Sequence, residues 1–138
     1  MVVQVAVNYA AILAASIASF ILGMLWYGLF FRKPWIQLMG FDKKKLKEAK
    51  NNSMAKMHII TFLSGVVLNF VLAHIIGFAQ VGTIIEALGV GFLVWIGFVA
   101  TLMLGTVLWE GKPIKLYVIN VLYYLFSFLI ASAILFLI

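Results

Sequence analysis

The stretch at residues 104–116 reads LGTVLWEGKPIKL, and it separates two long uncharged tracts. These tracts cover residues 87–109 and 116–138. Each is longer than the roughly 20 residues that a helix needs to cross about 30 Å of hydrocarbon. Gly111 can adopt the left-handed conformation that ends a helix, and Pro113 suits a helix start. The stretch therefore predicts a tight turn between two membrane-spanning helices.

Two further uncharged tracts lie upstream, at residues 2–31 and 57–85. Hydrophobic residues make up 66% of the chain and charged residues 10%, whereas soluble domains are about half apolar and a quarter charged. A soluble domain of 138 residues could not bury so much apolar surface. The sequence predicts one all-α domain, a four-helix transmembrane bundle. The predicted spans cover residues 6–31, 55–78, 85–109 and 114–138.

The net charge of +6 is concentrated in two of the loops. The segment 32–56 holds Arg32, Lys33, Lys43, Lys44, Lys45, Lys47, Lys50 and Lys56, and the turn before the fourth span holds Lys112 and Lys115. Four alternating spans place both loops on one side, and the positive-inside rule makes that side cytoplasmic. We therefore expect a cytoplasmic loop at residues 32–54 and both termini outside.

The segment 42–50, DKKKLKEAK, predicts a short basic helix on the membrane surface. We expect it to meet anionic lipid headgroups rather than nucleic acid. The residues predicted to make this contact are Lys43, Lys44, Lys45, Lys47 and Lys50.

The ends of the first and third tracts share a pattern. LGMLWYGLFFRKPWIQL at residues 22–38 and LGTVLWEGKPIKL at residues 104–116 both contain Leu-Gly, Leu-Trp, Gly, Lys-Pro and Leu in that order. In this alignment Trp26 and Trp109 occupy equivalent positions in the two halves. It favours a duplicated two-helix hairpin whose halves are related by a pseudo-two-fold axis along the membrane normal.

Small residues recur every fourth position before the two Leu-Gly pairs. They are Ala15, Ser19 and Gly23 in the first span, and Gly97, Thr101 and Gly105 in the third. Small side chains at this spacing let two helices approach closely in lipid. We expect the first and third spans to cross near Gly23 and Gly105. The alternative is that small residues are simply frequent in membrane helices.

Two ionisable pairs are candidates for interaction. Glu110, at the inner end of the third span, is predicted to pair with Arg32 or Lys33 at the end of the first span. His74 and Glu86 lie near the outer ends of neighbouring spans, where a pair would be sensitive to pH. The alternatives are a solvated Glu110, a Glu86 that serves the first turn of its helix, and a His74 that bonds a neighbour.

The chain carries no nucleophile–base motif, phosphate-binding loop or metal-ligand spacing. It has no cysteine, and its two histidines are predicted at opposite ends of the bundle. We expect no cofactor and no enzyme activity. The favoured function is a structural or accessory membrane subunit that acts as an oligomer or with a partner. The alternative is a small transporter or channel formed by an oligomer.

Several segments also resemble a known family. They are Asn8, GMLWYGLFF from Gly23, KPW from Lys33, LMG from Leu38, GFLVWIGFVAT from Gly91 and WEGKPIKLYVIN from Trp109. With these the chain resembles small bacterial and archaeal membrane proteins grouped as domain of unknown function 1761. The resemblance implies a four-span protein of the prokaryotic plasma membrane. It implies no assigned activity and no functional residues.

Overall fold

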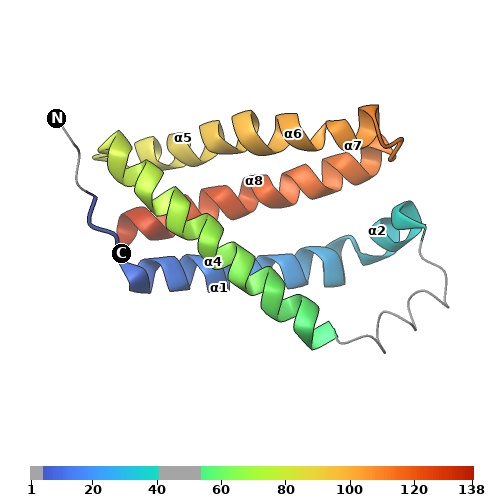
Figure 1. Ribbon diagram of the computed structural model, residues 1–138, viewed down its shortest axis with the longest axis horizontal. Helices are drawn as coiled ribbons and strands as arrows, with labels where there is room; N and C mark the ends of the chain where they lie inside the picture. The colour runs from blue at the N-terminus through green and yellow to red at the C-terminus, as the bar shows by residue number, and fades with distance from the viewer. Residues whose placement is uncertain (1–4, 41–53) are drawn as a thin grey trace.

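The structure is a computed structural model, and it describes residues 5–40 and 54–138. All regular elements in this part of the chain are helical, which confirms the predicted all-α bundle (Figure 1). The elements are α1 (Tyr9–Leu25), η1 (Trp26–Phe30), α2 (Arg32–Met39), α4 (Met54–Ala79), α5 (Ile84–Val94), η2 (Trp95–Ala100), α6 (Thr101–Met103), α7 (Gly105–Leu108) and α8 (Ile114–Leu137). The predicted surface helix at residues 42–50, with its five lysines, lies outside the described residues.

These elements form four helices that are long and apolar enough to cross a membrane. The four are Tyr9–Phe30, Met54–Ala79, Ile84–Leu108 and Ile114–Leu137. The first and third are interrupted by the π-helical segments η1 and η2, in which the hydrogen bonds run to the fifth residue instead of the fourth. The chain is therefore a multi-pass membrane protein.

The fourth helix, α8, occupies the centre of the bundle. It packs along α1 on one side and along α5 on the other, while α4 crosses α1 and α8 obliquely (Figure 1). The buried core lies where these helices meet and consists of Ala15, Leu72, Ile76, Phe128 and Ala131. Because α1 and α5 both pack on α8, that helix determines the position of both.

The start of α1 and the last residue of the chain meet at one end of the bundle. Asn8 caps α1, because its Oδ1 accepts hydrogen bonds from the backbone N–H groups of Ala10 and Ala11. Its Nδ2 also donates to the carbonyl oxygen of Ile138 at 3.2 Å. At the opposite end, Gly111 has a φ of 68°, which confirms the predicted left-handed turn before α8.

The predicted crossing of the first and third spans is wrong. Gly23 faces α8 instead, since a Cβ added to it would lie 3.0 Å from the hydroxyl oxygen of Tyr123. Gly97 has open space around it, and Gly105 has only the ring of Trp109 nearby, at 3.9 Å. The small residues of the first span therefore make room for an aromatic side chain of α8 and not for the third span.

Trp26 and Trp109 do not occupy the equivalent environments that the motif alignment predicted. The side chain of Trp26 is 8% exposed, whereas that of Trp109 is 89% exposed. The two hairpins pack differently as well. While α8 packs along both α1 and α5, α4 packs mainly on α1. A two-fold axis would give α4 the same contact with α5 that α8 has with α1. Duplication of a hairpin stays a prediction from the sequence.

A pair of glycines on α5 tests the packing against α8. A Cβ on Gly91 would overlap Ser132 Oγ and lie 3.0 Å from the carbonyl oxygen of Phe128, whereas one on Gly89 would meet nothing within 4 Å. We expect Gly91→Ala to lower the free energy of unfolding by about 1–3 kcal/mol through overpacking. The measurement is unfolding by SDS titration in mixed micelles.

Gly89→Ala is the matched control, because it gains the same helix propensity without the clash. It should leave stability unchanged or raise it by up to about 1 kcal/mol. If the two variants behave alike, α5 does not pack on α8 through Gly91.

Candidate functional site

Two tryptophans open the two π-helical segments and face α8 from opposite sides. Trp26 begins η1, and its Nε1 donates to the carbonyl oxygen of Ile119 at 3.1 Å. Trp95 begins η2, and its Nε1 donates to the carbonyl oxygen of Val121 at 2.7 Å. The two acceptors are two residues apart on α8, so the indoles hold this helix at the same depth.

Two tyrosines of α8 donate hydrogen bonds to the first and third spans. The Tyr123 hydroxyl donates to the carbonyl oxygen of Ser19 in α1 at 3.0 Å. The Tyr117 hydroxyl donates to the carbonyl oxygen of Ala100, the last residue of η2, at 2.7 Å. At that junction the π-helical pattern changes back to an α-helix, so the backbone bonding is irregular and a side chain can supply a hydrogen bond.

A fifth hydrogen bond joins two side chains. The Tyr27 hydroxyl donates to Asn120 Oδ1 at 2.7 Å. The Tyr27 ring lies against Trp35 of α2 and Tyr123 of α8, with ring centroids 5.6 and 5.3 Å away. We call the five side chains that make these bonds the aromatic clamp. Its members are Trp26, Tyr27, Trp95, Tyr117 and Tyr123.

The aromatic clamp contains no charged group, and its donors all have acceptors within the bundle. Interhelical hydrogen bonds in membrane proteins contribute about 0.6 kcal/mol each on average and up to about 1.7 kcal/mol. Five such bonds are substantial because no hydrophobic force draws helices together in lipid. In the described part of the chain, no group of three histidine, cysteine or acidic side chains could hold a metal ion. The geometry of the clamp is suited to fixing helix positions.

The predicted ion pair at the inner end is not formed in the structure. Arg32 and Lys33 begin α2, while the exposed Glu110 follows α7 on the far side of α8. No ion pair joins Glu110 to either cation in the described residues. The central position of α8 explains the difference, since it keeps the end of the first span apart from the end of the third.

The predicted outer pair of His74 and Glu86 is not formed either. His74 Nδ1 lies 2.8 Å from the carbonyl oxygen of Phe70, one turn earlier in its own helix. Glu86 Oε2 accepts a hydrogen bond from the backbone N–H of Gly82 at 2.8 Å, and Thr83 Oγ1 accepts from the N–H of Glu86. Both groups are used locally, and Glu86 with Thr83 stabilises the start of α5.

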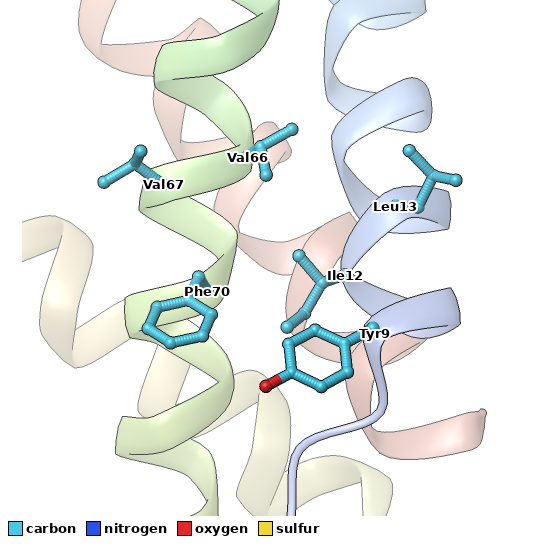
Figure 2. Close-up of a pocket in the computed structure, with 6 residues that line it drawn as sticks. All are labelled: Tyr9, Ile12, Leu13, Val66, Val67 and Phe70. Carbon is cyan, nitrogen blue, oxygen red and sulfur yellow. The ribbon is translucent and has the colours of Figure 1, made fainter.

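An apolar groove lies between α1 and α4. It has a volume of about 400 Å³ and is lined by Tyr9, Ile12, Leu13, Val66, Val67 and Phe70. Figure 2 shows Tyr9 of α1 and Phe70 of α4 on opposite sides of the gap, with Ile12 between the helices. Its only side-chain polar atom is the Tyr9 hydroxyl, so the groove offers a surface for hydrocarbon and little for a polar ligand.

Sequence reasoning missed Trp95 and Tyr117 as members of the clamp. A signal was present but ambiguous, because Trp-x-Gly occurs at Trp26–Gly28, Trp95–Gly97 and Trp109–Gly111. The Leu-Trp pattern favoured Trp109, but the side chain of Trp109 is exposed. The structural counterpart of Trp26 is therefore Trp95.

The family match can be placed on this geometry. The family model described as "protein of unknown function (DUF1761)" matches residues 10–136. The chain belongs to this family. The match runs from α1 to α8 and includes the whole aromatic clamp, and it confirms the resemblance seen in the sequence. The search of curated proteins and the search of solved structures found no match.

The clamp predicts unequal effects at three tryptophans. We expect Trp26→Phe and Trp95→Phe each to lower the free energy of unfolding by about 1 kcal/mol or more, because each removes an interhelical hydrogen bond and some packing volume. Trp109→Phe should change it little, since this ring is 89% exposed. SDS titration measures all three variants, and a loss at Trp109 equal to that at Trp95 would contradict the assignment.

Proposed function

We propose that the protein is a non-enzymatic membrane subunit that works as an assembly of several copies. The observation that carries this proposal is the unequal burial of the spans. In an apolar stretch of 18 residues from each span, 11% of the third span is buried inside the bundle, whereas 28% of the first and 28% of the fourth are buried. The third span is therefore attached to the rest of the chain mainly along one side, through α8.

The open side of the third span carries small residues. Gly97 and Thr101 are exposed, and a Cβ on Gly97 would meet nothing within 4 Å. The Thr101 hydroxyl donates to the carbonyl oxygen of Gly97 at 2.6 Å, so it requires no other partner. Small residues on a lipid-facing side allow a second helix to approach closely, which is the main route to association in a bilayer. We assign this side to a second copy of the chain.

The orientation of the subunit belongs to the same proposal. Figure 1 shows α2 and the turn between α7 and α8 at the end of the bundle opposite to the C-terminus. These segments and the first turn of α8 carry Arg32, Lys33, Lys112 and Lys115. By the positive-inside rule this end would face the cytoplasm, which supports the proposal that both termini lie outside a prokaryotic plasma membrane. The lysines of residues 43–50 would meet anionic headgroups of the inner leaflet.

Substitution of Gly97 tests the assembly. We expect the wild-type chain to form oligomers in native mass spectrometry from mild detergent, and Gly97→Leu to shift them to monomer because the larger side chain blocks close helix approach. Gly65→Leu is the matched control, since Gly65 of α4 also has open space around it. A monomeric wild-type chain, or equal effects of the two substitutions, would sink the proposed interface.

A second measurement tests the absence of transport. We expect liposomes that contain the wild-type protein to show the same proton, ion and small-solute flux as empty liposomes. A saturable flux would overturn the structural role and support a transporter or channel.

A further inference from the structure

The groove between α1 and α4 has a closed floor and an open rim. Ile12 at the floor is 3% exposed, whereas Tyr9 on the rim is 71% exposed. Leu13 and Val67 on the rim are also more than half exposed. All the lining residues belong to two helices that are long and apolar enough to cross a membrane, so the groove opens to the hydrocarbon of the bilayer.

Two contacts between α1 and α4 hold the groove in shape. Towards the middle of the first span, Asn69 Nδ2 donates to Ser16 Oγ at 3.2 Å, and both residues are buried. Before α1, the side chain of Val5 packs so closely on Gly77 of α4 that a Cβ added to this glycine would overlap it. The groove residues of α1 lie between these two contacts in the chain. The spacing of the helices is therefore fixed, and binding in the groove costs little conformational entropy.

The size of the groove limits the kind of occupant that it can hold. Its volume is about 400 Å³. A helix with its side chains is about 10–12 Å wide and rises about 5.4 Å per turn, so a single turn fills roughly 500 Å³. The lining also contains no glycine, alanine or serine, the residues that let a second helix approach closely. A helix would rest on the rim and leave the floor uncovered, whereas a flexible acyl chain can reach Ile12.

The chemistry of the lining favours hydrocarbon. The lining side chains are aliphatic or aromatic, and the Tyr9 hydroxyl is their only polar group. Water does not enter apolar cavities of this kind. An unfilled groove would lose the dispersion contacts that its lining atoms could make. An acyl chain that lies in the groove supplies these contacts.

Tyr9 marks the end of the groove that is nearest to the membrane surface. It is the first residue of α1, directly after the capping residue Asn8. Figure 2 shows its ring across the gap from Phe70, with the hydroxyl directed towards α4. Within the described part of the chain, no residue forms a hydrogen bond with this hydroxyl. Tyrosines at a membrane boundary keep the ring in the apolar layer and the hydroxyl among polar groups, so this hydroxyl can donate to a lipid ester.

We propose that the groove binds one acyl chain of a glycerophospholipid from the leaflet at the start of α1. The chain lies over Ile12 between the two helices, and the Tyr9 hydroxyl donates a hydrogen bond to an ester carbonyl oxygen of the same lipid. The site is separate from the proposed contact between copies of the chain, which uses the third span.

Photolabelling of the unaltered chain tests the site directly. The protein in mild detergent is irradiated with a phosphatidylethanolamine that carries a diazirine in one acyl chain, and the labelled peptides are identified by mass spectrometry. We expect the labelling to saturate at one lipid per chain, to fall on residues 12–13 and 66–67, and to be prevented by excess unlabelled phosphatidylethanolamine. No labelling, unsaturable labelling or labels spread over all four spans would overturn the proposal.

Removal of the hydroxyl tests the polar end of the site. Tyr9→Phe keeps the ring and loses one hydrogen bond, so we expect the lipid to bind about two- to tenfold more weakly in the same labelling experiment. Unchanged binding would contradict the contact between the ester and Tyr9.

A substitution that fills the groove provides the matched test. Val67→Trp places an indole on the exposed rim and should abolish the saturable labelling. Val118→Trp is the control, because Val118 of α8 is also exposed and lies outside the groove, and it should leave the labelling unchanged. SDS titration checks that both variants fold. Retained labelling in Val67→Trp would overturn the proposal, and so would a change from oligomer to monomer without loss of labelling, which would assign the groove to a second copy.

Discussion

The hydrogen bonds from Trp26 and Trp95 to the backbone of α8 are the constraint on which the bundle depends. In a bilayer, apolar side chains gain nothing by leaving lipid for protein, so polar contacts and close packing must choose the helix partners. Two indoles reach the carbonyl oxygens of Ile119 and Val121 from opposite sides. Tyr123 and Tyr117 return the contact to the first and third spans. The fourth helix is thereby held from both sides with uncharged groups alone.

The spans could be predicted from the sequence because hydrophobic length is a one-dimensional property. Their partners could not, since a row of small residues indicates that something approaches closely without indicating what. Gly23 lies in such a row, and the side chain that fills the space beside it is Tyr123 of α8. Trp-x-Gly occurs at Trp26, Trp95 and Trp109, and only the structure shows that Trp26 and Trp95 begin π-helical segments. A π-helical turn is a local departure from the regular helix that composition does not predict.

The predicted charge pairs failed for a related reason. Nearness to the same membrane surface does not bring two side chains together when a helix stands between them, as α8 does between Arg32 and Glu110. At the outer end, His74 and Glu86 find partners within one turn of their own positions. A local partner has the advantage that the helix already holds it in place, so less conformational entropy is lost in forming the bond. Sequence reasoning included this local alternative, and the structure selects it.

The central position of α8 also explains why one side of α5 is not covered by another helix in the described part of the chain. A helix that binds α1 and α5 on two sides leaves α5 with one covered side. The remaining side shows Gly97, where the backbone is little shielded. Lipid chains are mobile and pack poorly against such a surface, whereas a second helix can approach it closely and gain dispersion energy along its length. The same hydrogen bonds that hold α8 between α1 and α5 therefore leave one side of α5 open, and this is the side that we propose a second copy of the chain covers.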